Sequence, residues 1–122
     1  MPGPALSTTV ETFRSATIFH VTGEIDMSTV AELEKGLERA IGLSEVPPGI
    51  VIVDFRGITF LGAEGLRVVV AAQNKVASTG VSIRVVAPPG GGMIRRLLDL
   101  SGVGVLLDLY DSLEAALPPE SH

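Results

Sequence analysis

A continuous apolar run at residues 50–55, Ile-Val-Ile-Val-Asp-Phe, limits the folds that this chain can adopt. A strand with one face in water alternates apolar and polar residues, whereas a strand covered on both faces is apolar almost throughout. The run therefore predicts an interior strand of a sheet. Of the 122 residues, 46% are hydrophobic and 19% are charged, a length and composition typical of one folded domain with one core.

The segments before this run predict an antiparallel start and then a helix. Residues 8–13 and 16–23 are short β-rich runs separated by two residues, which predicts a hairpin. From Thr29 the apolar residues recur every three or four positions up to Ile41, which predicts an amphipathic helix. Thr29 and Glu32 have the spacing of a capping box, in which each side chain bonds the backbone N–H of the other residue.

The segments after the run alternate between helix and strand patterns. The pattern predicts a loop at 56–62, a helix at 63–78, a strand at 81–87 and a glycine-rich connector at 88–92. It then predicts a helix that begins at Met93 and ends at Gly102, a strand at 105–110 and a short helix at 111–117. Strands that alternate with helices form right-handed parallel crossovers. The predicted fold class is therefore α/β, a mixed sheet of about five strands with an N-terminal antiparallel hairpin, then parallel βα units, and about four helices. The single domain is predicted to span 8–117, with flexible tails at 1–7 and 118–122.

Charge and composition exclude several classes of function. The net charge is −5, from 9 basic and 14 acidic residues, so the chain lacks the cationic surplus that binds nucleic acid or an anionic membrane. It has no cysteine, which excludes disulfide and thiol chemistry. The chain does not open with a signal-peptide pattern, and its apolar stretches end well short of the roughly 20 residues that cross a membrane. We therefore expect a cytoplasmic protein without direct membrane insertion, present as a monomer or weak homodimer.

The sequence contains no catalytic or metal-binding pattern. His20 lies inside a predicted strand and His122 is the last residue, and no serine occupies a G-x-S-x-G turn. Glu24 and Asp26 are two carboxylates that lack a third ligand nearby in the sequence, so we interpret them as part of a solvated turn. The chain is therefore predicted not to be an enzyme and to bind neither a metal nor a cofactor.

Residues 90–92 are three glycines that precede a predicted helix, and the exposed N–H groups of a helix start can bind anions. The segment lacks the lysine and the Ser or Thr of a P-loop, and it lacks the spacing of a dinucleotide fingerprint. Nucleotide binding, at this connector or at the start of the helix at 63–78, remains an alternative function.

Four segments, in order, resemble the STAS family. Residues 53–66, Val-Asp-Phe-Arg-Gly-Ile-Thr-Phe-Leu-Gly-Ala-Glu-Gly-Leu, are similar to a block of its anti-sigma factor antagonists, in which a strand ends in Asp and Asp-Ser-Ser-Gly-Leu opens a helix. Residues 23–26 look like the family's Gly-Glu-Leu-Asp turn, residues 95–102 like the helix before its last strand, and residues 110–117 like its C-terminal helix. The resemblance implies a STAS-like fold over nearly the whole chain.

The resemblance also implies a switch that regulates transcription. In such antagonists an anti-sigma factor of the serine kinase type phosphorylates the first Ser of Asp-Ser-Ser-Gly, and only the unphosphorylated form binds that kinase and frees the sigma factor. This chain has Gly62, Ala63 and Glu64 where the family has Asp, Ser and Ser. Because Ala63 has no hydroxyl, phosphorylation at the usual position is chemically impossible. Thr59 carries the nearest hydroxyl upstream.

The partner-binding residues that the resemblance implies are Glu24, Asp26, Thr59, Leu61, Gly62, Ala63, Glu64, Gly65, Leu66 and Arg67. The negative charge of Glu64 suits the first turn of a helix, but a partner would meet a carboxylate in place of a serine. We therefore expect a module that binds an anti-sigma factor or a related regulator and is either locked in one state or adapted to a different partner. An accessory subunit of a membrane lipid or solute transport system is an alternative that the family also allows.

Overall fold

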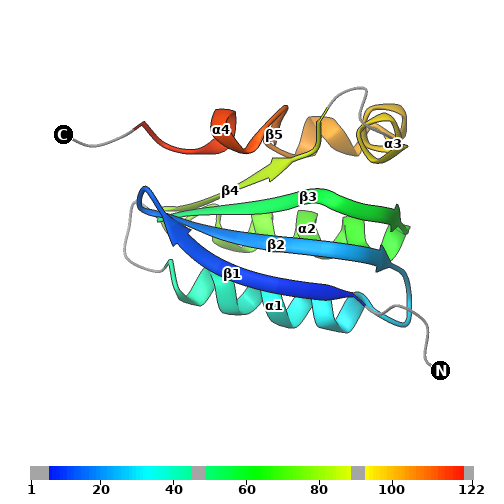
Figure 1. Ribbon diagram of the computed structural model, residues 1–122, viewed down its shortest axis with the longest axis horizontal. Helices are drawn as coiled ribbons and strands as arrows, with labels where there is room; N and C mark the ends of the chain where they lie inside the picture. The colour runs from blue at the N-terminus through cyan, green and yellow to red at the C-terminus, as the bar shows by residue number, and fades with distance from the viewer. Residues whose placement is uncertain (1–5, 45–48, 89–92, 120–122) are drawn as a thin grey trace.

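The computed structural model describes residues 6–44, 49–88 and 93–119 (Figure 1). Its elements, in chain order, are β1 (Ser7–Phe13), β2 (Ala16–Ile25), α1 (Val30–Gly42), β3 (Gly49–Leu61), α2 (Ala63–Val76), β4 (Val81–Val86), α3 (Met93–Ser101), the 3₁₀ helix η1 (Val103–Leu106), β5 (Leu109–Tyr110) and α4 (Leu113–Ala116). The strands form one sheet in the order β1-β2-β3-β4-β5. β1 is antiparallel to β2, and the other neighbouring strands are parallel. The predicted fold class is confirmed.

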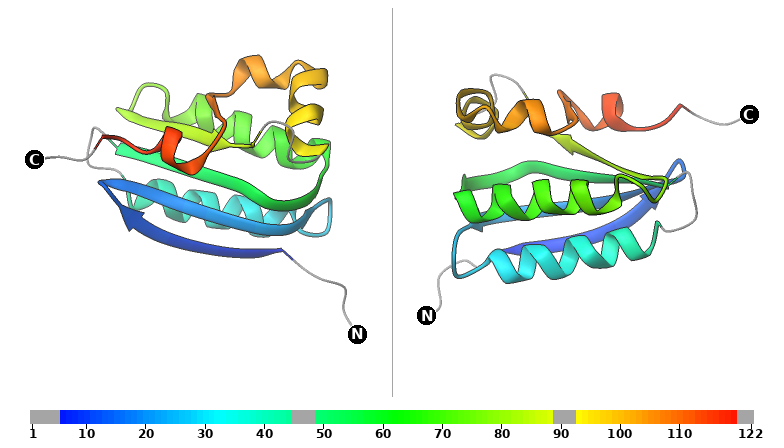
Figure 2. Two further views of the ribbon diagram at one scale, coloured as in Figure 1. Left: turned by 45° about the horizontal axis from the view of Figure 1, so that its top comes forward. Right: turned by 180° about the vertical axis from the view of Figure 1, so that it is seen from behind.

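β3 is the central strand, and the apolar run within it is buried. Val51, Ile52 and Val53 are each 0% exposed. α1 and α2 cover one face of the sheet, as the view from behind in Figure 2 shows, and Val51 and Val53 share a core cluster with residues of these helices. Ile52 belongs to a second cluster, with Ala116 of α4. Alternate residues of the run therefore enter two separate clusters, which explains why the run lacks polar alternation.

The predicted loop at 56–62 is wrong, because β3 continues through Leu61. β2 is also longer than predicted, and the two strands stay paired from Thr22 with Gly57 to Ile25 with Leu61. Register shifts lie just before this pairing, between His20 and Thr22, and within it, between Gly23 and Glu24. Irregularities of this kind let a strand continue while its side chains are aimed in a new direction. Leu61 thereby returns to the core and is 4% exposed.

The C-terminal segment also differs from its prediction. The residues predicted as a strand at 105–110 are divided between η1 and the two-residue β5. Val105 is 88% exposed whereas Leu107 is 7% exposed, so the apolar pattern here does not mark one buried strand. The last helix is shorter than the predicted 111–117. It begins after Ser112, whose hydroxyl caps it by accepting a hydrogen bond from the Ala115 N–H at 3.0 Å, and it ends at Ala116, before the extended Leu117.

The remaining boundaries are close to their predictions. α2 ends at Val76 rather than at 78, a difference within the usual variation of helix ends. β1 begins at Ser7, and Leu6 is 6% exposed because it packs in the main core cluster. The ordered fold therefore starts before the predicted boundary at residue 8. The other parts of the predicted tails, 1–5 and 120–122, lie outside the described residues.

Candidate functional site

Two turns meet at the carboxyl edge of the sheet, where β2 leads to α1 and β3 leads to α2 (Figure 1). Ile25 and Leu61 are paired across the last position of the two parallel strands. One residue further on, the Gly62 N–H donates a hydrogen bond to the Ile25 carbonyl at 2.8 Å. The turn that holds Asp26 and the start of α2 at Ala63 therefore lie side by side, so the predicted site residues come from two segments that share one surface.

The carboxylate of Asp26 organises the turn between β2 and α1. It accepts hydrogen bonds from the Ser28 N–H at 2.9 Å, the Ser28 hydroxyl at 2.6 Å and the Thr29 N–H at 3.2 Å. These bonds, above all the one from the Ser28 hydroxyl, lower the pKa of Asp26. The predicted capping box is wrong, because the Thr29 hydroxyl donates to the Glu24 carbonyl at 2.7 Å and makes no capping bond to the helix. Asp26 therefore fixes the turn, and the Glu24 side chain is left exposed.

Gly65 lets the first turn of α2 pack closely on the ends of the strands. A Cβ atom at this position would lie 2.5 Å from Ile25 Cγ2 and 2.8 Å from Leu61 Cδ1. Both separations are shorter than any that real Cβ atoms adopt, so a larger residue would push the helix away from the sheet. Gly62, the N-cap of α2, is less restricted, because a Cβ there would approach only the mobile end of Glu64, 2.6 Å away, and backbone at 3.3 Å.

The predicted partner-binding residues differ in how much they offer to a partner. Ala63 and Arg67 are exposed, and Glu64 and Leu66 are half-buried. Leu61 and Gly65 are buried, and they support the surface from beneath rather than form it.

Thr59 lies in β3 and not in a loop as predicted. Its side chain is exposed, and its hydroxyl donates to the Gly23 carbonyl of β2 at 3.2 Å. The Thr59 hydroxyl, the nearest one upstream of Ala63, therefore forms a cross-strand hydrogen bond. It lies in β3 and not at the start of α2, where the family block described above has its serine.

Two exposed apolar side chains extend this surface and were not predicted. Met27 follows Asp26 and is 79% exposed, and Phe60 is 50% exposed. Phe60 pairs with Glu24 across the strands, and its ring edge lies 3.6 Å from the Cβ position of Gly62. Large apolar side chains gathered on a surface are typical of contact sites. Sequence analysis did not select these two residues, because a single methionine in a polar turn and a single phenylalanine in a segment predicted as a loop show no helix or strand periodicity.

A polar network that the sequence analysis missed lies on β1, β2 and β3. Asp54 is 5% exposed and accepts hydrogen bonds from Arg56 Nε and Nη2, both at 2.8 Å, and from His20 Nδ1 at 2.7 Å. His20 Nε2 lies 2.6 Å from Glu11 Oε2. Both ring nitrogens of His20 therefore lie within hydrogen-bond distance of carboxylate oxygens, and the imidazole bridges Glu11 and Asp54. Burial raises the pKa of Asp54, but the bonds from Arg56 and His20 outweigh it, so the pKa is lowered.

A metal site receives no support from the described residues. Within 6–44, 49–88 and 93–119, no group of three or more His, Cys, Asp or Glu residues could hold a metal ion. The glycine-rich connector, 90–92, lies outside the described part of the chain. In the same described ranges, no helix has the length and apolar character needed to cross a membrane.

Comparison with protein families identifies the chain. Residues 7–116 match the STAS domain family. The chain belongs to the STAS family. The anti-sigma-F factor antagonist RsfB of Mycobacterium tuberculosis is similar to this STAS domain, with 26% identity over 113 residues that cover 93% of this chain and 88% of that protein. The predicted family, of the anti-sigma factor antagonist type, is confirmed.

Solved structures agree with this assignment. The crystal structure of an anti-sigma factor antagonist from Mycobacterium paratuberculosis superimposes with a TM-score of 0.78 and 31% identity, covering 91% of this STAS domain and 90% of that chain. The anti-sigma factor antagonist SpoIIAA in its unphosphorylated form has the same fold, with a TM-score of 0.62 at 16% identity over 88% of this chain and 91% of that one.

Proposed function

We propose that this STAS domain is an anti-sigma factor antagonist that regulates transcription by binding an anti-sigma factor and is not switched off by phosphorylation at the start of α2. The similarity to an antagonist over nine-tenths of both chains, at 31% identity, is the observation that carries the first part. The second part rests on Ala63, which occupies the exposed first position of α2 and has no hydroxyl. Such a regulator acts in the cytoplasm, the location expected from the sequence.

The proposed contact surface combines an apolar centre with acidic neighbours. Met27 and Phe60 offer exposed apolar area. Glu24 is the cross-strand partner of Phe60, Asp26 directly precedes Met27, and Glu64 lies in the first turn of α2. Buried apolar and aromatic anchors supply most of the affinity of protein interfaces, whereas rim charges select the partner and steer its approach. We therefore expect the anti-sigma factor to present a basic rim around an apolar pocket.

Glu64 distinguishes this surface from that of the resembling antagonists. Its side chain is half-buried in the first turn of α2, where the positive end of the helix dipole favours a negative charge. The carboxylate is permanent, whereas a phosphate is added and removed. The proposed partner therefore has a cation that pairs with Glu64, and its binding to this STAS domain does not depend on ATP, because Ala63 cannot accept phosphate.

The test is binding to an anti-sigma factor kinase with and without ATP. The wild-type chain should bind the kinase with the same affinity in the presence and in the absence of ATP. Mass spectrometry should find residues 62–66 unmodified. The variant Ala63→Ser/Glu64→Ser should accept phosphate on the serine at position 63 and then bind about thirty-fold to a few thousand-fold more weakly, since an uncompensated charge buried against a partner costs about 2–5 kcal/mol. Ala77→Ser, an exposed alanine at the far end of α2, is the matched control and should remain unmodified.

Two results would contradict the proposal. Phosphate on Thr59 of the wild-type chain would show that a switch exists at another residue. Unchanged affinity of the phosphorylated double variant would show that the start of α2 is not the interface.

A further inference from the structure

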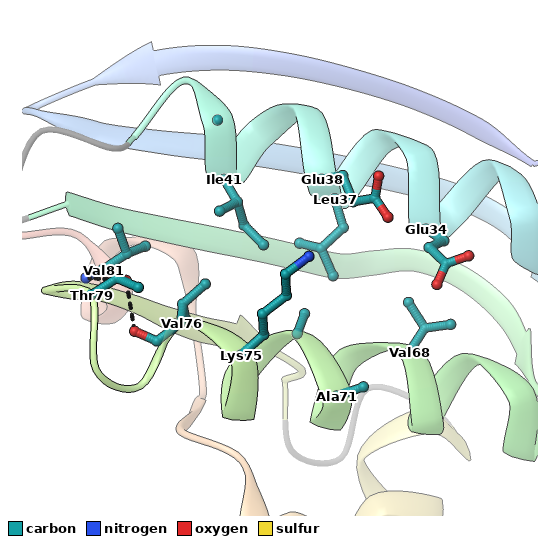
Figure 3. Close-up of a pocket in the computed structure, with 12 residues that line it drawn as sticks. Glu34, Leu37, Glu38, Ile41, Val68, Ala71, Lys75, Val76, Thr79 and Val81 are labelled. Atoms are coloured by element: carbon teal, nitrogen blue, oxygen red, sulfur yellow. Dashed lines mark hydrogen bonds between the residues drawn. The ribbon is translucent and has the colours of Figure 1, made fainter.

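A groove of about 560 Å³ lies between the middle and C-terminal parts of α1 and α2 (Figure 3). On α2 it begins at Val68 and continues to Val76, so it lies beyond Arg67, the last residue of the proposed partner surface. Its volume is in the range of sites that bind a ligand or an inserted side-chain cluster. The groove therefore lies outside the surface that the proposed function assigns to the anti-sigma factor.

The periodicity of both helices creates the groove. α1 lines it with Glu34, Leu37, Glu38 and Ile41, at the spacing i, i+3, i+4 and i+7 of one helix face. α2 lines it with the face that is turned toward α1, and two neighbouring positions on this face are alanines.

These two positions, Ala71 and Ala72, are small, so the side chains of the two helices do not fill the space between them. The lining stretches are residues 34–42 of α1 and 68–76 of α2, and Thr79 and Val81 close the groove beyond the end of α2. At about 1.5 Å per residue each helical stretch is about 12 Å long, a little more than two turns of a helix.

The floor of the groove is apolar and its rims are charged. Leu37 and Val76 are buried beneath it, 1% and 4% exposed. Glu34 and Glu38 stand on the α1 rim, and Lys75 extends from α2 across the opening (Figure 3). None of these three exposed charges forms an ion pair or a hydrogen bond with another residue of the described ranges. The groove therefore combines unfilled apolar area with unpaired charges of both signs, two of them negative.

This charge pattern selects among possible occupants. A fatty acid or a nucleotide would bring a negative group toward Glu34 and Glu38, which like-charge repulsion disfavours. An amphipathic helix suits the groove better, because its aliphatic side chains at i, i+3 and i+7 can reach the apolar floor. Basic side chains one turn apart on that helix can pair with Glu34 and Glu38, which are also one turn apart.

We propose that the groove between α1 and α2 docks an amphipathic helix of a partner protein, with basic residues against Glu34 and Glu38 and an acidic residue against Lys75. This docking site is independent of the proposed interaction with an anti-sigma factor. It gives the STAS domain a second partner contact, a little more than two helical turns long.

The test uses fluorescently labelled helical peptides of three turns as probes. A basic peptide carries leucine at i, i+3, i+4 and i+7, lysines on one flank and one glutamate on the other. An acidic peptide has the flanking charges exchanged, and a scrambled peptide has the same composition without the periodicity. Fluorescence anisotropy should show saturable binding of the basic peptide and much weaker binding of the other two.

Three variants locate the binding. Ala71→Trp fills the groove from an exposed position and should weaken binding of the basic peptide at least about tenfold. Ala77→Trp, exposed on the same helix but outside the groove lining, should leave binding unchanged. Glu34→Lys/Glu38→Lys should reverse the preference and bind the acidic peptide. Unaltered thermal melting checks that each variant is folded.

The proposal fails if the basic peptide does not saturate below about 1 mM, or if the scrambled peptide binds equally well. It also fails if sedimentation shows a wild-type dimer that Ala71→Trp converts to a monomer, because the occupant would then be a second copy of this chain. None of these results depends on whether an anti-sigma factor binds at the start of α2.

Discussion

Gly65 is a residue whose smallness positions the candidate site. At an unhindered helix position, glycine is about 1 kcal/mol less favourable than alanine. At Gly65 a Cβ would collide with Ile25 and Leu61 at 2.5 and 2.8 Å. Overpacking of this kind costs about 1–3 kcal/mol and outweighs the gain in helix propensity. The close approach of α2 to the ends of β2 and β3 therefore requires glycine.

We predict that Gly65→Ala lowers the free energy of unfolding by about 1 kcal/mol, measured by urea denaturation. Gly42→Ala is the matched control, because it lies at the end of α1 and its added Cβ would meet nothing within 4 Å. This control should be neutral or more stable by up to about 1 kcal/mol. Effects of the same sign at both glycines would show that close packing at Gly65 is not the reason for its presence.

Met27 and Phe60 lead to a prediction about affinity. Since both side chains are at least half exposed, replacing either with alanine should leave the urea midpoint nearly unchanged while weakening binding to the anti-sigma factor at least about tenfold. Leu43→Ala, 59% exposed at the opposite end of α1, should affect neither quantity. Calorimetric titration measures the affinities, and equal binding by all three variants would remove Met27 and Phe60 from the interface.

At the scale of elements, the network of Glu11, His20, Asp54 and Arg56 joins three strands shortly before β3 reaches the site. Asp54 contributes most because it is buried and bonds to both Arg56 and His20. The pKa of Asp54 is lower in the folded than in the unfolded chain, where it is about 3.9. The ionised Asp54 therefore stabilises the fold fully above the unfolded-state pKa, and this stabilisation is lost as the pH falls through the folded-state pKa.

We predict that the urea midpoint falls between about pH 5 and the folded-state pKa of Asp54, and that Asp54→Asn reduces this part of the pH dependence. At pH 7 the variant should be less stable by about 1–3 kcal/mol, since it leaves hydrogen-bond donors of His20 and Arg56 without their charged acceptor. Asp108→Asn, on an exposed aspartate, serves as the control and should keep the wild-type profile. An acid transition that is identical in Asp54→Asn would contradict the assigned role.

The elements also show where sequence patterns were sufficient. The apolar run predicted the central strand, and the three-to-four residue period predicted α1, because burial of these residues follows directly from local periodicity. The continuation of β3 was missed because Arg56 and Gly57 break the apolar pattern, and pairing with β2 maintains the strand there instead.

The candidate site was predicted in part, through residues that resemble a family block. The adjacency of Asp26 and Gly62 follows from parallel strands that end at one edge. The network around Asp54 could not be predicted, because it depends on which residues of three strands come into register, and sequence spacing does not give that register.

At the scale of the whole molecule, one charge in the central strand should disrupt the fold. Val53 is 0% exposed, and Val53→Asp would bury a carboxylate without a partner, which costs several kcal/mol. We predict that this variant is unfolded or strongly destabilised by circular dichroism. Val105→Asp, at a position that is 88% exposed, should change stability by less than about 0.5 kcal/mol. Retention of wild-type stability by Val53→Asp would be incompatible with the central position of β3.

The bond from the Gly62 N–H to the Ile25 carbonyl has a kinetic consequence for recognition. This bond holds the backbone of the Asp26 turn against the start of α2, so the two segments need not be brought together when a partner binds. Association then includes no rearrangement of these two backbone segments, and the entropy lost on complex formation comes from exposed side chains such as Met27. Differences in affinity among partners, or among variants of this surface, should therefore appear as differences in the lifetime of the complex rather than in the rate of encounter.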